Sequence, residues 1–407
     1  MMEFTLKNGM KIIYIKRESN ITSMCFGLEA GAFAEKEDEI GIAHALEHLL
    51  YKETETMTED DINKRMSRIF GMTNAMTNFP YVIYYGSCLK EDTEEAFLIF
   101  SEVLRKPTLR KEHLYDEVKV INEELNEWKD DPYQYCEDKL YFNAYEKARL
   151  KYPIIGEKQH IDKFNIEKLR EFYNRNYTPD NCVLGIVSNH SFQSILDIME
   201  GYFGDWENPI KKSRKPYKIS EHNKNLKSID KKKGLSGVKI EYLFKINNLS
   251  KYDKKALRIF NEIFGATGNG IIYDEIRTKS GLAYDVSSRL VFDKGIEHLL
   301  IKVGTSKGNE DEVIKKLNEC IERVKENKYK ISHLDIKNVM KTIELKNALD
   351  NEMSLRLCIR HTINEIMFND HKSVERIFDE KDEFTVEFIN DLVKRVLDKP
   401  TIQVITD

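Results

Sequence analysis

The predicted elements of this chain occur twice in the same order, and this repeat constrains the fold more than any other feature. Each half begins with strands, continues with helices and further strands, and ends with helices. The first half opens on a hairpin whose turn holds Asn8 and Gly9, and the second opens on a strand over Val238–Ile246. The spacing of about two hundred residues is far longer than a solenoid repeat. We therefore predict an α+β fold of two related domains from an internal duplication, each an antiparallel or mixed β-sheet packed with helices.

A change of composition separates the two halves. Residues 208–234 are polar and rich in lysine, contain two prolines and show no clear hydrophobic period, which is typical of a linker. We expect one domain over residues 1–207 and a second over residues 235–407. With 41% hydrophobic residues in a chain of 407, each half is long enough to bury a core of ordinary size.

The helix predicted over Ile40–Lys52 carries the motif His-x-x-Glu-His at residues 44–48. His44 and His48 share one helical face because they are four residues apart, and the carboxylate of Glu47 leaves the helix close to that face. Two neutral imidazoles and a carboxylate are the two ligands and the general base of a hydrolytic zinc site. The alternative is an amphipathic helix with two surface histidines. The apolar neighbours argue against it, because buried histidines are costly unless paired or bound to metal.

A second informative helix is predicted over Lys111–Lys129. Glu117 and Glu124 are seven residues apart, which is two helical turns, so they lie on one face. Three apolar side chains mark a buried side next to that face. Glu123 and Glu127 fit a solvated surface, and from the spacing alone a charged, solvated helix remains possible for the whole segment.

Charge and cysteine usage exclude several classes of protein. The net charge of −5 gives no indication of nucleic acid or of a membrane surface as a partner. The six cysteines are scattered without a Cys-x-x-Cys pair, so we expect them to be small buried residues in a reducing compartment.

Residues 1–16 enter strands without the apolar segment of a secretory signal, and the chain has no run of eighteen apolar residues. These features predict a cytoplasmic protein.

With these motifs, the chain resembles the pitrilysin/insulinase/mitochondrial-processing-peptidase family of zinc metallopeptidases, whose signature is the inverted motif His-x-x-Glu-His. It is most similar to the short bacterial processing-peptidase-like members. The segment His44–Thr54 follows the family's metal helix, except that Glu53 stands where the family usually has Gly. The resemblance covers almost the whole chain and implies the LuxS/metallopeptidase-like fold.

The resemblance implies one Zn²⁺ per chain, held by His44, His48 and Glu124, with Glu47 as the general base. Glu124 fits the third ligand because 75 residues separate it from His48 and because it follows another glutamate by seven positions. That other glutamate, Glu117, is expected to orient a metal-binding histidine. Glu123 is the alternative ligand by one position, although its side chain would point about 100° away on the helix.

Two further stretches resemble parts of the family's active site. Asn74 and Ala75 fall in a segment similar to the edge strand that binds the backbone of the substrate, but residues 78–80 depart from the family pattern there. The segment Tyr273–Tyr284 is similar to the signature of the second half. The resemblance therefore assigns Arg277 to holding the substrate and Tyr284 to binding the oxyanion that develops during hydrolysis.

The function implied is that of a zinc-dependent endopeptidase for extended peptides or unfolded polypeptides. Family members enclose the substrate between four domains, so a chain of two domains implies a clam-like homodimer, or a heterodimer with a related chain. Two alternatives stay open. One is a non-catalytic or partner-dependent subunit of such a peptidase, and the other is a dedicated maturation protease for one secreted or modified peptide.

Overall fold

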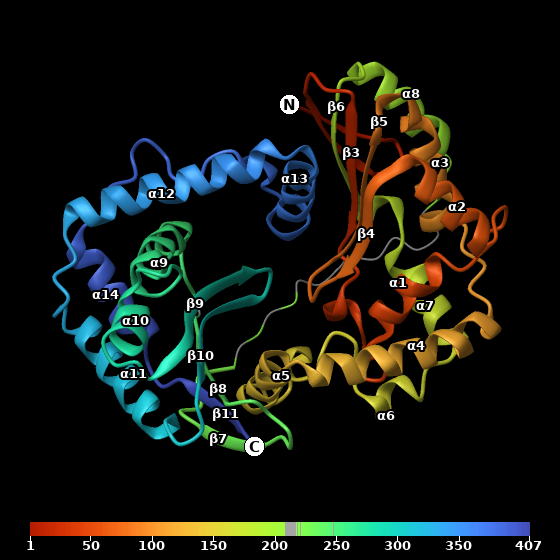
Figure 1. The fold of residues 1–407 in the computed structure, drawn as a ribbon. Coiled ribbons are helices and arrows are strands. Elements are labelled where there is room, and N and C mark those ends of the chain that lie inside the picture. Colours follow the sequence, from red (N-terminus) through yellow and green to blue (C-terminus); the bar gives the residue numbers. More distant parts are fainter. Residues whose placement is uncertain (208–216, 218, 220, 247) are drawn as a thin grey trace. The chain divides into compact units, whose positions relative to one another are not determined.

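A computed structural model describes residues 1–207, 217, 219, 221–246 and 248–407 of the chain (Figure 1). The described residues form two compact units, each assembled from three segments. Unit 1 comprises Met1–Asn126, Tyr152–Pro216 and Ala348–Glu375. Unit 2 comprises Glu127–Lys151, Tyr217–Asn347 and Arg376–Asp407. Each half of the sequence therefore contributes one segment to the unit built mainly by the other half.

Each unit contains one mixed β-sheet. The sheet of unit 1 has the order β1-β2-β6-β3-β5-β4, and that of unit 2 has the order β7-β11-β8-β10-β9. The strands of the first sheet are β1 (Met2–Thr5), β2 (Lys11–Lys16), β3 (Ile21–Leu28), β4 (Phe70–Thr77), β5 (Val82–Leu89) and β6 (Cys182–Ser188). The strands of the second are β7 (Lys227–Lys231), β8 (Val238–Lys245), β9 (Ala283–Asp293), β10 (Ile296–Thr305) and β11 (Thr401–Thr406).

The two sheets share one pairing pattern. In unit 1, β2 pairs with β6 in parallel, and the neighbours β6–β3, β3–β5 and β5–β4 are antiparallel. In unit 2, β7 pairs with β11 in parallel, and β11–β8, β8–β10 and β10–β9 are antiparallel. Only β1, the partner of β2 in the predicted hairpin, has no counterpart among the described strands of unit 2. The topology confirms the predicted α+β class and its internal duplication.

Helices cover both faces of the sheet in unit 1. These are α1 (Ile42–Leu50), α2 (Glu59–Ile69), α3 (Thr93–Arg105), α4 (Lys111–Asp130), α6 (Lys158–Ile161), α7 (Ile166–Asn176), α8 (Phe192–Phe203) and α13 (Ser354–Phe368). One face holds the main hydrophobic core, to which α1, α3 and α8 contribute. Helix α13 packs on the opposite face, against β3 and β6 (Figure 1). A helix from the second half of the sequence thus completes unit 1.

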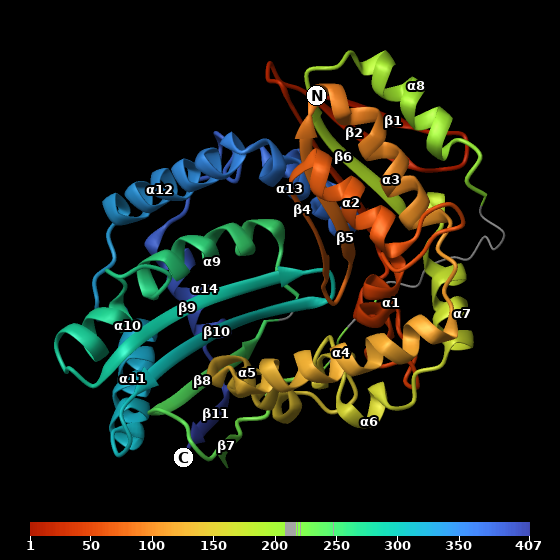
Figure 2. The same cartoon turned by 45° about the vertical axis from the view of Figure 1, so that its right-hand side comes forward.

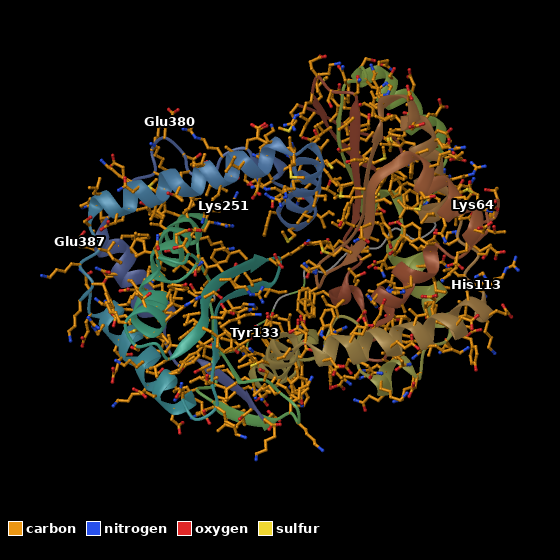
Figure 3. The ribbon with its side chains drawn as sticks, viewed as in Figure 1. Lys64, His113, Tyr133, Lys251, Glu380 and Glu387 are labelled. Carbon is orange, nitrogen blue, oxygen red and sulfur yellow. The ribbon has the colours of Figure 1, made fainter. Side chains whose placement is uncertain are left out.

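The sheet of unit 2 is covered in a related way. Its helices are α5 (Pro132–Ala144), α9 (Lys251–Phe264), α10 (Ile271–Tyr273), α11 (Glu310–Lys325), α12 (His333–Glu352) and α14 (Val386–Val396). One face is apolar and contacts α9, α11 and α14 (Figure 2). The other face contacts α5, whose second residue is Tyr133 (labelled in Figure 3). This contact includes charged groups: Glu137 of α5 forms ion pairs with Arg289 and with Lys302, the latter at 2.6 Å.

Local sequence accounts for two element boundaries. Strand β3 ends at Leu28, shortly before the chain turns at Gly31, where an added Cβ would lie 2.1 Å from the carbonyl oxygen of Asn78. Helix α5 begins at Pro132, a residue well suited to the first helical turn.

Helix α10 continues into a π-helical turn over Asp274–Thr278. The segment predicted to be a linker differs from expectation. Strand β7 lies inside the stretch interpreted as a linker, whose residues 208–216 are outside the described part. Strand β7 has no buried residue and pairs through its backbone, so its lysine-rich sequence gave no apolar signal.

The six cysteines are all buried and unpaired. None of the helices among the described residues is both long enough and apolar enough to cross a bilayer.

Candidate metal centre

The rotation of α1 is determined by its apolar residues. Six of its nine side chains are buried, namely Ile42, Ala43, Ala45, Leu46, Leu49 and Leu50. The helix starts at Gly41, whose φ of 91° favours glycine and whose added Cβ would lie 2.6 Å from the carbonyl oxygen of Ile155. With the apolar side in the core, the remaining residues His44, Glu47 and His48 lie together on the other side, half-buried.

The three predicted ligands meet at one point. The Nε2 atoms of His44 and His48 lie 3.9 Å and 3.5 Å from Oε2 of Glu124 on α4. One ligand atom from each residue lies within 4.8 Å of the other two, and the described part of the chain has no second set of three that does so. Bonds of about 2.0–2.2 Å in a tetrahedral zinc site place ligand atoms roughly 3.3–3.6 Å apart. The donor set and its spacing therefore fit zinc.

Glu123, the alternative to Glu124, is exposed and is not part of this set. The difference comes from the packing of α4, which buries Leu114, Glu117, Ile121 and Leu125. This packing directs Glu124 toward the histidines and its neighbour to solvent.

Glu117 orients His48. Its Oε2 lies 2.9 Å from Nδ1 of His48, and its Oε1 lies 2.6 Å from Nζ of Lys52. Burial alone would lower the pKa of His48, but the hydrogen bond to Glu117 and the charges of Glu124 and Glu117 raise it overall. Burial likewise opposes ionisation of Glu117, yet His48 and Lys52 lower the pKa of its carboxyl. With Nδ1 engaged, His48 presents Nε2 to Glu124, as in many metal-binding histidines.

The other two polar residues of α1 have contrasting surroundings. Burial, followed by the neighbouring His48, lowers the pKa of His44 to about 3, so its imidazole is neutral and has a lone pair for a metal. Burial raises the pKa of Glu47, although a hydrogen bond from Thr77 partly offsets this effect. The Thr77 hydroxyl, at the end of β4, donates to Oε2 of Glu47. A carboxylate with a raised pKa is suited to accepting a proton.

The contacts of Thr77 and Lys52 with the site were not predicted from the sequence. Lys52 follows His48 by four residues within the helix predicted over Ile40–Lys52, which would place it one turn further on, although in the structure it lies just after the end of α1. Thr77 carries no comparable signal, because its contact with Glu47 depends on how β4 packs against α1.

The remaining predicted residues lie on β4 and in unit 2. Asn74 and Ala75 fall on β4, the edge strand of its sheet, where the Ala75 N–H donates to Oδ1 of Asn74 at 2.9 Å. Arg277 is exposed, with its guanidinium 5.0 Å from the ring centroid of Tyr273. The hydroxyl of Tyr284 lies 2.5 Å from Nζ of Lys239, which donates to it. The functional roles of these four predicted residues stay predictions.

The sequence matches known proteins along most of its length. Residues 12–158 match the family described as Insulinase (Peptidase family M16), and residues 163–340 match the Peptidase M16 inactive domain. An uncharacterized zinc protease of Rickettsia bellii (strain RML369-C) is 30% identical over 72% of this chain and 70% of its own length. The chain therefore belongs to peptidase family M16.

Two further comparisons cover nearly the whole chain. The uncharacterized zinc protease YmxG of Bacillus subtilis (strain 168) is 26% identical over 97% of this chain and 95% of its own length. The crystal structure of a protease from Helicobacter pylori has a TM-score of 0.91 at 18% identity, and the match covers 100% of this chain and 99% of that one. The second likeness shows the fold, and the relatives' names support a zinc-type peptidase.

Proposed function

We propose that this chain is a zinc-dependent endopeptidase that hydrolyses peptide bonds in extended peptides or unfolded polypeptides. The observation that carries this proposal is the meeting of His44, His48 and Glu124 within 4.8 Å, with Glu47 on the same helix as the two histidines. The two relatives named zinc proteases support the choice of metal.

Different residues of the chain bind the metal, transfer the proton and orient the base during hydrolysis. His44, His48 and Glu124 would hold zinc, which when bound supplies a Lewis acid and lowers the pKa of water. Glu47 accepts a proton from the attacking water and delivers it to the leaving amine. Thr77 holds one oxygen of Glu47, so the carboxylate keeps a constant orientation while its other oxygen carries the proton.

Strand β4 supports an extended substrate. In the described structure it pairs with β5 on one side only, which leaves its outer backbone groups open to an added strand. Pairing through the backbone favours length and an extended conformation over side-chain identity. We propose that Asn74 and Ala75 align the substrate in this way, and that a folded protein is a poor substrate.

The experiment that tests the proposal measures zinc content and cleavage of a quenched, unstructured peptide by the purified full chain. We expect one zinc per chain in the wild type and in Glu47→Gln, with cleavage lost only in the variant. Glu37→Gln makes the same chemical change at an exposed position and is the matched control. His48→Ala is expected to lose zinc. Unchanged turnover in Glu47→Gln would exclude Glu47 as the base.

A partner-dependent role is the second candidate function. It is favoured by the match of residues 163–340 to a domain described as inactive, and by α9, which occupies the position of α1 in unit 2 and contains no histidine. Against it, the first half retains a full ligand set and a base. Zinc without cleavage in the wild type would favour this candidate over a self-sufficient peptidase.

A dedicated maturation protease would share this chemistry and differ only in its substrate. A cytoplasmic location is likewise a proposal, supported by six buried cysteines that form no disulfide.

A further inference from the structure

An irregularity in the sheet of unit 2 determines where the side chain of Tyr284 points. Strands β8, β10 and β9 are neighbours in this sheet (Figure 2). The pairing of β10 with β9 shifts at Gly304, and Tyr284 is the extra residue of the resulting β-bulge. Bulges redirect a side chain and are frequent next to active sites. The redirected side chain of Tyr284 is 47% exposed, so its hydroxyl can reach a ligand outside the sheet.

The ring of Tyr284 lies across β10 and reaches Lys239 on β8. Gly304 pairs with Lys239 on that side, and a Cβ added to Gly304 would lie 2.7 Å from Cε2 of Tyr284, so the close approach of the ring requires a glycine. At the far end of the ring, Nζ of Lys239 donates a hydrogen bond of 2.5 Å to the hydroxyl of Tyr284. The bulge, the glycine and the lysine together hold the hydroxyl in one place.

Lys239 brings a positive charge to this hydroxyl from a buried position. The side chain is only 6% exposed, and no carboxylate of the described part of the chain forms an ion pair with it. Nζ lies 4.2 Å from the ring centroid of Tyr133 and 4.8 Å from that of Tyr284. Two aromatic rings and one hydroxyl therefore stabilise a charge that a buried lysine usually shares with an acid. The positive potential at the Tyr284 oxygen is not cancelled by a neighbouring carboxylate.

The direction of the hydrogen bond decides what Tyr284 can bind. An ammonium group has three donors and no acceptor, so the oxygen of Tyr284 must accept from Lys239. The hydroxyl hydrogen is then available for another acceptor, and none of the described residues takes it. Consecutive hydrogen bonds strengthen one another, and a donor with a positive charge behind it favours a negative oxygen over a neutral one.

We infer that Lys239 is a positioning residue for the proposed hydrolysis. Its hydrogen bond holds and polarises the hydroxyl of Tyr284, which donates to the negative oxygen that develops on the scissile carbonyl. No proton leaves either side chain in this step. The inference rests on the proposed function and on the predicted role of Tyr284, and it holds whether Tyr284 serves the metal centre of its own chain or that of a partner chain.

The test compares kcat and KM for cleavage of the quenched peptide by the zinc-loaded wild type, Lys239→Met, Tyr284→Phe and the double variant K239M/Y284F. We expect kcat to fall about 100-fold or more in Tyr284→Phe and about 10-fold in Lys239→Met, with KM nearly unchanged. The double variant should be no slower than Tyr284→Phe, because Lys239 acts through the hydroxyl. Lys231→Met makes the same change at an exposed position of β7 in this sheet and should keep the wild-type kcat.

A phosphinic peptide gives a second readout that needs no turnover, because it carries a stable negative oxygen in place of the scissile carbonyl. In the zinc-loaded Glu47→Gln variant, adding Lys239→Met should weaken binding of the phosphinic peptide about 10-fold. Binding of the uncleaved parent peptide should stay the same. A merely structural role of Lys239 would change both affinities together. If Lys239→Met does not fold, Lys239→Gln replaces it, since it removes the charge and keeps a donor of similar length.

The outcomes separate this inference from the proposed function. A wild type that cleaves the peptide, with equal kcat in Lys239→Met, would overturn the inference and leave the peptidase intact. An equal fall of kcat with and without the hydroxyl of Tyr284 would also overturn it, because Lys239 would then act by another route. A wild type that binds zinc and cleaves nothing would contradict a self-sufficient peptidase and this inference with it.

Discussion

At the scale of the residue, the surroundings of a side chain decide its chemistry more than its identity does. Glu47 and Glu117 are both carboxylates that interact with His48. Burial raises the pKa of Glu47, whereas His48 and Lys52 lower that of Glu117. The first carboxylate is therefore suited to exchanging protons, and the second to holding a histidine in place.

Thr77 is expected to adjust the pKa of Glu47. Thr77→Val removes the hydroxyl that donates to Glu47, so the pKa of that carboxyl should rise by about one unit or more. Because Glu47 must be ionised to act as the base, the acidic limb of the kcat/KM profile should move to higher pH while zinc content stays constant. Thr73→Val, which removes the hydroxyl bound to the Tyr85 carbonyl, is the matched control. Identical profiles in both variants would contradict the role of Thr77.

His298 is expected to make the fold sensitive to acid. It lies on β10, fully buried, with its Nε2 3.1 Å from the hydroxyl of Tyr141 on α5, and burial followed by the charge of Arg289 lowers its pKa to about 3. Below its ordinary pKa of about 6.5, the unfolded chain binds a proton that the native chain excludes. Stability should therefore fall by about 1.4 kcal/mol per pH unit between about pH 6 and pH 3.

The measurement is urea unfolding of the wild type and His298→Gln across this pH range. The variant should have the shallower dependence on pH, because its amide binds no proton. His333→Gln, at an exposed position, should follow the wild type. Parallel curves for the wild type and His298→Gln would show that this histidine does not control the acid response.

At the scale of the element, three segments bring the metal centre together. Helix α1 carries two of the proposed ligands and the proposed base, α4 carries the third proposed ligand and Glu117, and β4 ends in Thr77, which contacts Glu47. The helical spacing in α1 and α4 is a local property and was predicted from the sequence. The approach of β4 to α1 is a tertiary contact and was not.

Ala75→Pro is expected to separate substrate binding from metal binding. A proline is tolerated on an edge strand when its missing N–H faces away from the sheet, and the Ala75 N–H donates to the Asn74 side chain. If a substrate pairs with β4 there, the variant should raise KM for extended peptides and keep its zinc. Equal KM values for the wild type and the variant, with an unchanged melting temperature, would show that the substrate does not pair at this position.

At the scale of the whole molecule, each half of the sequence supplies a helix to the unit built mainly by the other. Helix α13 packs on unit 1 through apolar contacts, whereas the contacts of α5 with unit 2 include the ion pairs of Glu137 with Arg289 and Lys302. The metal centre lies within unit 1, and Arg277 and Tyr284 belong to unit 2. The assembly determines whether these two residues serve the site of their own chain or the site of a partner chain.

Mixing two inactive variants tests which chain's site Arg277 and Tyr284 serve. Glu47→Gln lacks the base and retains Arg277 and Tyr284, while the double variant R277A/Y284F retains the metal centre. If a partner's residues serve each site in a homodimer, the mixture should recover about a quarter to a half of wild-type cleavage, because hybrid dimers contain one intact site. No recovery, with exchange of subunits shown by native mass spectrometry, would place all the residues of a site in one chain.

The sequence by itself determined the fold class, the duplication and the residues of the metal helix. These properties follow from the periodicity of helices and strands and from the cost of burying histidine in an apolar segment. Only the tertiary structure decided that Glu124 faces the histidines and Glu123 faces solvent, and that Thr77 reaches Glu47. Those contacts join residues far apart in the chain, and their geometry depends on how whole elements pack, which no local pattern records.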